Sequence, residues 1–248
     1  SHNMSLFYQL NGVMTYDSTY SPSFNQLREL APQVRDFESD WIFNITDPDL
    51  IEFLSVKYAI VTQESELPST GSWRLLTDSY RNSLKVYRND AYRPLGTTYS
   101  DVISIDTLIH DYDTDLSLLN QKIIAKEEDV EAIRSCLRSD SVSVLENIHY
   151  QHNSLTGYLT CEDRSFLVLS LPYDEGWNIL VNGREVPVYE VNGGFIGVPV
   201  DAGDNQFEMY FVPKGLKAGV LISGFSGVAI IFLSFIQWKK GKRQPRRQ

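Results

Sequence analysis

An uncharged apolar run near the C-terminus constrains this chain more than any other feature. Residues 218–238 read AGVLISGFSGVAIIFLSFIQW and carry no charged side chain. An α-helix rises about 1.5 Å per residue, so these 21 residues span about 31 Å, which matches the ~30 Å hydrocarbon layer of a bilayer. A helix of this length in the core of a water-soluble domain would carry a polar stripe. The run therefore predicts one transmembrane helix, which we place at residues 214–238.

The charges that follow this helix predict how it is oriented. Short flanking segments rich in Lys and Arg stay on the cytoplasmic side of a membrane. Such a segment follows the apolar run directly, with cations at Lys239, Lys240, Lys242, Arg243, Arg246 and Arg247. We therefore expect a protein of the cell membrane whose residues 239–248 form a basic cytoplasmic tail and whose residues 1–213 are extracytoplasmic.

The body of the chain is strongly acidic. Without the six cations of the tail, 16 of the 22 Lys and Arg remain against 32 Asp and Glu, a formal charge of −16. This balance gives no electrostatic footprint for nucleic acid, so we expect no nucleic-acid partner. With 42% hydrophobic and 12% aromatic residues, the chain has ample material for a packed core.

The last third of the body has the pattern of a β-protein. Short apolar or alternating segments are separated by turn residues, and Asn182-Gly183 is the strongest short hairpin signal. Asn192-Gly193-Gly194 offers a second turn. An antiparallel β-sandwich over residues 139–213 is expected, with strands beginning around Val142–Ile148 and continuing at 157–161, 166–171, 177–181, 185–190, 195–200 and 206–212.

The first part of the body mixes helix and strand signals, which makes the expected fold class α+β. Helical patterns begin at Pro22 and, with Thr46 or Asp47 as N-cap, at Pro48. Buried and shorter strands are expected at 58–61, 73–76 and 84–87, with a turn at 82–83. We assign residues 1–98 to a small α/β unit and residues 99–138 to a helical connection of two or three short helices.

The two cysteines leave two readings open. Cys136 and Cys161 could pair in an oxidising compartment, or each could be a small buried hydrophobic residue. A second question is how the body crosses the membrane, because a stop-transfer helix at the end does not export it. We expect a C-terminal piece of a longer polytopic protein. The upstream membrane helices of that protein are expected partners of the apolar helix.

Signatures of soluble enzymes are absent from the sequence. No P-loop, G-x-G-x-x-G, G-x-S-x-G or H-E-x-x-H motif occurs, and the four histidines have no metal-ligand spacing. The acids Asp111, Asp113 and Asp115 lack the Gly and Glu that a calcium loop requires, so we interpret them as caps. We assign no catalytic residue, metal ligand or cofactor.

Two polar-aromatic clusters are candidate substrate-binding sites. In the first, Tyr173, Asp174 and Trp177 combine rings that can pack on the C–H groups of a sugar with an acid that accepts hydroxyl hydrogen bonds. The alternative is that Trp177 fills the core of the sandwich. The second cluster contains Asn11, Tyr16, Asp17 and Ser18; its alternative is a surface loop that packs Tyr16 against the α/β unit.

Several motifs resemble the YfhO family of large bacterial membrane proteins, which are grouped with C-type glycosyltransferases. The matching pieces are Asn3-x-Ser5 with Gly12, Tyr16 and Ser18; Leu54–Tyr58; Val86–Asn89 followed by Pro94-Leu95-Gly96; and PYDEGWNILVNGREVPVYEVNGGFIGVPVDAGDN…YFVPKGLKAG. They run from end to end of the chain in the expected order. The chain departs from the family pattern at Ser55, where a glycine is expected.

This resemblance implies a function and leaves an alternative open. It implies a polytopic glycosyltransferase that moves a sugar from an undecaprenyl-phosphate carrier to a cell-surface polymer such as lipoteichoic acid. The catalytic acid would lie in an early extracytoplasmic loop outside this chain, and this part would position lipid-linked sugar and polymer. The alternative is a non-catalytic structural or protein-interaction domain. A carbohydrate site needs an exposed cleft lined by Tyr and Asp or Asn, whereas a scaffold would bury those aromatics.

Overall fold

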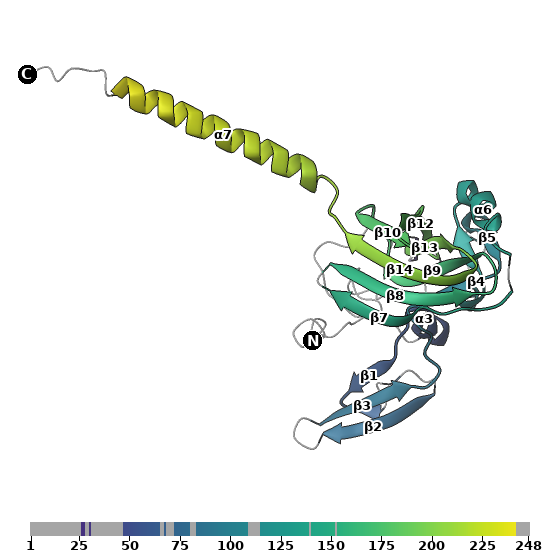
Figure 1. Cartoon of the computed structure of the whole chain (residues 1–248). Helices are drawn as coiled ribbons and strands as arrows, with labels where there is room; N and C mark the ends of the chain where they lie inside the picture. Colours follow the sequence, from purple (N-terminus) through teal and green to yellow (C-terminus); the bar gives the residue numbers. More distant parts are fainter. Residues whose placement is uncertain are drawn as a thin grey trace, which may run out of the picture. The chain divides into compact units, whose positions relative to one another are not determined.

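The computed structural model describes residues 26, 27, 30, 47–64, 67, 72–79, 83–108, 115–138, 140–151 and 153–241. The body contains three sheets and several short helices, and it is followed by one long helix (Figure 1). This arrangement confirms the α+β class with a C-terminal apolar helix. The elements are α3 (Pro48–Phe53), β1 (Tyr58–Val61), β2 (Trp73–Ser79), β3 (Leu84–Asn89), β4 (Gly96–Tyr99), β5 (Val102–Ser104), α4 (Ile105–Leu108), α5 (Leu118–Gln121), β6 (Ile123–Ala125), α6 (Glu127–Arg134), β7 (Glu146–Gln151), β8 (Ser154–Cys161), β9 (Ser165–Pro172), β10 (Trp177–Val181), β11 (Arg184–Glu185), β12 (Tyr189–Val191), β13 (Phe195–Val200), β14 (Gly203–Phe211) and α7 (Leu216–Gly241).

Two of the sheets form the expected sandwich. One has five strands in the order β11-β10-β14-β8-β7, and the other has six in the order β4-β9-β13-β12-β6-β5. Figure 1 shows β7, β8 and β14 lying side by side in the five-stranded sheet. In the six-stranded sheet all neighbouring strands are antiparallel except β5 and β6, which run parallel. In the five-stranded sheet β11 pairs antiparallel with β10, and β8 pairs antiparallel with both β14 and β7.

The six-stranded sheet is covered on both faces, which explains why its central strands have no polar side. On β9, Leu167 and Leu169 pack into the core between the two sheets, whereas Phe166 and Val168 pack into a second core with the helices. Side chains alternate across a strand, so each face of β9 fills a different core. Gly197 on β13 leaves room for this arrangement, because a Cβ there would lie 2.4 Å from the ring of Phe166.

The hairpin turn predicted at Asn182-Gly183 is confirmed. Asn182 and Gly183 have φ values of 53° and 73°, and Val181 pairs with Arg184 across them, as a two-residue hairpin turn requires. The continuous strand expected at 185–190 is wrong. The chain leaves the five-stranded sheet after Glu185, passes Pro187, which has no N–H to donate to a ladder, and joins the six-stranded sheet at Tyr189.

The segment expected to be a helical connection also contributes to the sandwich. It contains the three short helices α4, α5 and α6, and in addition the strands β5 and β6, which extend the six-stranded sheet. Strand β4, from the expected α/β unit, pairs with β9 in the same sheet. These pairings join residues far apart in the sequence, so local periodicity did not reveal them.

The three-stranded sheet β1-β3-β2 follows α3, which begins as expected. The carboxylate of Asp47 is the N-cap and accepts hydrogen bonds from the backbone N–H groups of Asp49 (3.0 Å) and Leu50 (3.1 Å). The expectation that residues 58–61 form a buried strand is wrong in one respect. The strand exists, but Tyr58 and Ile60 are 52% and 53% exposed. The predicted turn residue Asn82 and the start of the first predicted helix lie outside the described residues.

The cysteines do not form a disulfide. Cys136 is a free, buried thiol in the core between the six-stranded sheet and the helices, and Cys161 is free and buried in the core between the sheets. The second reading of the sequence, two small buried hydrophobic residues, therefore holds in this structure.

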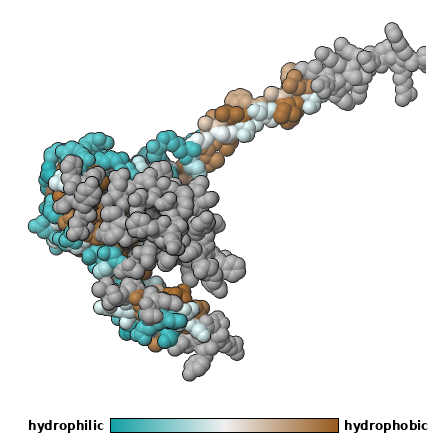
Figure 2. Space-filling view, turned by 180° about the vertical axis from the view of Figure 1, so that it is seen from behind, coloured by the Kyte–Doolittle hydropathy of each residue, from teal (hydrophilic) through white to brown (hydrophobic). Residues whose placement is uncertain are grey.

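Helix α7 is long and apolar enough to cross a membrane. Large hydrophobic side chains such as Leu221, Phe225 and Phe232 are 62%, 75% and 62% exposed, and Figure 2 shows apolar residues in brown along the helix. Helix α7 belongs to a compact unit separate from the body, and four residues connect the end of β14 to its first residue. The orientation of this helix in a membrane stays a prediction.

Candidate functional site

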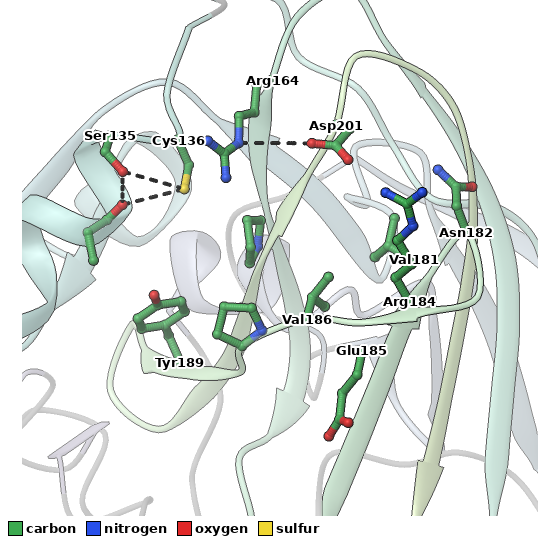
Figure 3. A pocket seen from close by; sticks show the side chains of 13 residues that line it. Ser135, Cys136, Arg164, Val181, Asn182, Arg184, Glu185, Val186, Tyr189 and Asp201 are labelled. Carbon is green, nitrogen blue, oxygen red and sulfur yellow. Dashed lines mark hydrogen bonds and ion pairs between the residues drawn. The ribbon is translucent and has the colours of Figure 1, made fainter.

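A pocket of about 570 Å³ opens at one end of the sandwich. Its size lies within the range of small-molecule sites. It is built by the C-terminal turn of α6, the residue before β9, the hairpin of β10 and β11, and the ends of β12 and β13 (Figure 3). The lining residues are Ala132, Ser135, Cys136, Arg164, Val181, Asn182, Arg184, Glu185, Val186, Pro187, Tyr189, Pro199 and Asp201.

Two arginines and an aspartate supply the charge of the pocket. The Nε atom of Arg164 lies 4.0 Å from Oδ1 of Asp201, and these side chains are 50% and 76% exposed. In the view of Figure 3, Asp201 lies between Arg164 and Arg184. At this exposure the ion pair contributes little to stability, at most about 1 kcal/mol. Both guanidinium groups therefore remain accessible to a ligand.

These arginines have an unusual setting in the sequence. They are the two Lys or Arg residues of the segment 139–213, which contains eleven Asp and Glu. Both line the same pocket, although they are twenty residues apart. The fold thus gathers the positive side chains of an acidic segment at one place, where guanidinium groups can donate several hydrogen bonds to phosphate, carboxylate or hydroxyl oxygens.

A pair of asparagines holds the hairpin that carries Arg184. The side-chain oxygen of Asn182 accepts a hydrogen bond from the backbone N–H of Gln206 at 2.8 Å, and its Nδ2 donates to Oδ1 of Asn205 at 3.2 Å. Asn205 is buried and donates in turn to the carbonyl of Asp201 at 2.8 Å. The same network therefore fixes the backbone on both sides of the pocket, next to Arg184 and at Asp201.

Tyr189 and Cys136 form the opposite wall. The ring of Tyr189 packs at 5.7 Å against Phe166, and Figure 3 shows its hydroxyl directed toward the side of Cys136. Burial, and to a smaller extent the nearby Cys136 and Asp129, raise the pKa of Tyr189, which keeps its hydroxyl protonated and able to donate a hydrogen bond. The Cys136 thiol, just after α6, donates to the carbonyl of Ala132 in the last turn of that helix at 3.4 Å. This wall offers a ring face and one hydroxyl.

The predicted residues of the first polar-aromatic cluster lie elsewhere. Tyr173, Asp174 and Trp177 form the turn between β9 and β10, at the far end of β10 from the pocket. Asp174 accepts a hydrogen bond from the N–H of Gly176 at 2.7 Å, and the indole of Trp177 donates to the carbonyl of Pro172 at 3.1 Å. Tyr173 and Trp177 are partly buried against the core between the sheets. Their binding role stays a prediction.

The second cluster, Asn11, Tyr16, Asp17 and Ser18, lies outside the described residues. The pocket itself was not predicted, because its residues come from five separate parts of the chain. One signal was available: Arg164 and Arg184 stand out as the cations of an acidic segment, and Arg184 directly follows the Asn182-Gly183 turn.

Comparison with known proteins connects this region to a family. Residues 126–223 match the family described as bacterial membrane protein YfhO. The "Uncharacterized protein YfhO" of Bacillus subtilis (strain 168) is 24% identical to this chain over 120 residues, which cover 48% of the chain and 14% of that protein. Residues 126–223 are therefore similar to the YfhO family of bacterial membrane proteins. It spans about 14% of the length of this curated relative.

The matched region contains the pocket and most of the sandwich. All lining residues fall between Ala132 and Asp201, and the match continues into α7. A match to a family of membrane proteins agrees with the length and apolar character of α7. The similarity to YfhO therefore covers the pocket, most of the sandwich and the first part of α7.

Proposed function

We propose that this chain is the substrate-positioning, extracytoplasmic part of a polytopic membrane glycosyltransferase. The parent protein takes a sugar from an undecaprenyl-phosphate carrier and adds it to a cell-surface polymer such as lipoteichoic acid. The catalytic acid and further membrane helices belong to other parts of the parent, and the basic tail lies in the cytoplasm. In this proposal the sandwich holds a phosphate-bearing substrate while the reaction takes place elsewhere.

The pocket is the observation that carries this proposal. A carbohydrate-handling domain requires an exposed cleft lined by Tyr and Asp or Asn, and this pocket combines Tyr189, Asp201 and Asn182 with two arginines. Lipid-linked sugars and lipoteichoic acid both carry phosphate, which guanidinium groups bind by charge-assisted hydrogen bonds. Asp201 and the Tyr189 hydroxyl supply an acceptor and a donor for sugar hydroxyls.

A separate feature favours the alternative, a protein-interaction domain. The three-stranded sheet exposes Tyr58, Ile60, Leu75 and Leu76, each between 46% and 53%. Exposed apolar side chains that gather on one small sheet are typical of contact surfaces. Residues outside this chain, in the remaining length of a YfhO-type protein, could pack on them. This alternative concerns another part of the body and does not use the pocket.

The proposal is tested in the parent protein rather than in this part alone. Membranes that contain the parent are given undecaprenyl-phosphate-linked, radiolabelled sugar and lipoteichoic acid, and transfer is followed over a range of substrate concentrations. Replacing Arg164 and Arg184 with Gln is expected to raise KM about tenfold or more, with a smaller effect on kcat, because binding is lost and the reacting groups remain.

The matched control is Arg134→Gln on the exposed surface of α6, where the guanidinium pairs with Glu131. This change removes one positive charge at a residue that does not line the pocket, and it should leave transfer unchanged. Unaltered KM in the Arg164→Gln, Arg184→Gln protein would reject the pocket as a substrate site. Absence of any transfer by the intact parent, with all its other substrates supplied, would reject the glycosyltransferase assignment itself.

A further inference from the structure

The outward side of the five-stranded sheet carries aromatic and uncharged polar side chains in addition to acidic ones. On β8 and β14, the side chains that face the core are apolar, for example Leu155, Leu159, Phe207 and Met209. The intervening residues face outward because side chains alternate along a strand. We call these residues the outer face; its members on β7, β8 and β14 are Glu146, His149, Gln151, Ser154, Thr156, Tyr158, Thr160, Asp204, Gln206, Glu208 and Tyr210.

Two tyrosines on the outer face are aligned along the sheet. Tyr158 is 52% exposed and pairs with Gln206, while Tyr210 is 40% exposed and pairs with Ser154. Tyr210 is therefore four residues along and one strand across from Tyr158. At about 3.3 Å per residue and about 4.8 Å between strands, their Cα atoms are about 14 Å apart. A linear ligand that lies along β8 and β14 can contact both rings.

Hydrogen-bonding side chains lie between the tyrosines and, at Thr160 and Asp204, beyond Tyr158. Gln206 donates to Glu208 at 2.8 Å, which orients its amide along the strand, and Thr160 donates to Asp204 at 2.7 Å. Thr156 and His149 are paired across β8 and β7 on the same face. These groups present carbonyl, carboxylate and hydroxyl oxygens, which are the acceptors that a polyhydroxylated ligand requires.

The charge of the outer face limits which ligand it can bind. The sequences of β7, β8 and β14 contain no Lys or Arg, and the outer face carries the acids Glu146, Asp204 and Glu208. An anionic polymer would be repelled from this face, because no guanidinium or ammonium group compensates its charge. A neutral ligand meets no such cost.

We propose that the outer face is a binding platform for a neutral glycan chain. The rings of Tyr158 and Tyr210 pack on the C–H faces of sugars at two points along the chain, and Gln206, Glu208 and Thr156 bond the hydroxyl groups between them. This platform is separate from the arginine-lined pocket, and its ligand differs in charge. It extends the proposed function by a second ligand class, and it does not require that the parent transfer sugar.

The test is an equilibrium binding measurement on the whole chain in phosphatidylcholine nanodiscs, which avoids sugar-headed detergents. Cellohexaose, hexa-N-acetylchitohexaose and maltohexaose are the neutral probes, and the hexamer of galacturonic acid is the anionic one; calorimetry reports binding. At least one neutral hexasaccharide is expected to bind, and the anionic hexamer is not. Tyr158→Ala and Tyr210→Ala should each weaken binding about three- to tenfold, as expected for loss of a ring contact, whereas Tyr→Phe changes retain most of it.

The neighbouring strand offers a matched control. Tyr150 on β7 is 56% exposed but pairs with Leu155, so it lies on the opposite side of the sheet. Tyr150→Ala should leave binding within twofold. The proposal is overturned if no neutral hexasaccharide binds, if Tyr150→Ala weakens binding as much as Tyr158→Ala, or if the face proves to join two copies and light scattering shows that Tyr158→Ala separates them. This binding experiment does not measure sugar transfer by the parent protein. A negative binding result therefore leaves the glycosyltransferase proposal standing, and a negative transfer result leaves the binding platform standing.

Discussion

Replacing Asn192 should remove one of the largest single contributions to the stability of the body. This side chain is fully buried in the turn between β12 and β13. Its Oδ1 accepts a hydrogen bond from the N–H of Ile124 at 3.1 Å, and its Nδ2 donates to the carbonyls of Leu119 and Lys122 at 3.2 and 3.0 Å. One amide therefore joins the α5–β6 segment to the middle of the six-stranded sheet.

The expected cost follows from these bonds and from the backbone. Three hydrogen bonds contribute about 1 kcal/mol each, and Ala at the observed φ of 51° adds about 1 kcal/mol, because Ala adopts this left-handed conformation less readily than Asn or Gly. Asn192→Ala should thus lower the free energy of unfolding by about 4 kcal/mol. Asn192→Gly loses the same bonds without the backbone term, so it should be about 1 kcal/mol less damaging than Asn192→Ala.

Urea unfolding of the chain in nanodiscs, followed by tryptophan fluorescence, measures both variants. With a urea dependence of about 2–3 kcal/mol per molar, a loss of 4 kcal/mol moves the midpoint by about 1.3–2 M. Asn192→Asp adds a sharper test. Its carboxylate would face the carbonyl oxygens of Leu119 and Lys122, which raises its pKa in the folded state. Its stability deficit should then shrink as the pH falls and the carboxyl is protonated. If Asn192→Ala unfolds within 1 kcal/mol of the unmodified chain, the buried amide does not hold these segments together.

Two further variants test local features of the body. Ser55 has a φ of 58°, and its hydroxyl forms a hydrogen bond with the hydroxyl of Ser170 at 2.7 Å. Ser55→Gly should relieve about 1 kcal/mol of backbone strain and lose a hydrogen bond of similar strength, so the free energy of unfolding should hardly change. A change above about 1 kcal/mol in urea unfolding would contradict this balance. The Lys122 ammonium lies 2.6 Å from the carboxylate of Asp101 and lowers the pKa of that carboxyl below its usual value. The stabilising contribution of this pair is therefore present at neutral pH and is lost as the pH falls through the folded pKa. Asp101→Asn should cost about 0.5 kcal/mol at pH 7 and nothing at about pH 2, and an equal loss at both pH values would refute the assignment.

The departure from the family pattern at Ser55 now has a physical explanation. The sequence resemblance predicts a glycine there, and the structure shows a left-handed backbone, the conformation that glycine adopts without strain. A serine is tolerated because its hydroxyl gains a partner on β9. The resemblance thus identified a backbone requirement before the conformation was known, although it could not supply the compensating contact.

Local signals predicted some elements of the fold closely and others not at all. Strands at 177–181 and 195–200 begin and end where turn residues predict, because the φ values of Asn182, Gly183 and the 192–194 turn are properties of those residue types. The division of residues 184–191 between two sheets was not predictable in this way. Which sheet a strand joins depends on partners such as β10 and β13, and these are set by tertiary packing.

The candidate site was harder to predict for the same reason. Sequence reasoning searched for aromatic and acidic residues that are adjacent in the chain, and it found the turn at Tyr173–Trp177. The pocket instead draws single residues from separate elements, and each of them alone has an ordinary surface alternative. The charge count of residues 139–213 is the one sequence signal that could have drawn attention to Arg164 and Arg184, and it does not show that they meet.

That charge count also explains why the two proposed surfaces would select different ligands. Two cations among eleven acids leave the sandwich segment strongly negative, so an anionic ligand is repelled from most of its surface. Arg164 and Arg184 make the pocket the exception, while Asp201 and Glu185 at the same place limit the net attraction. Affinity for phosphate must then come from directed hydrogen bonds rather than from a general positive field, and such bonds favour a ligand of the right shape. The outer face, with acids and tyrosines but no cation, can bind only ligands that bring no negative charge.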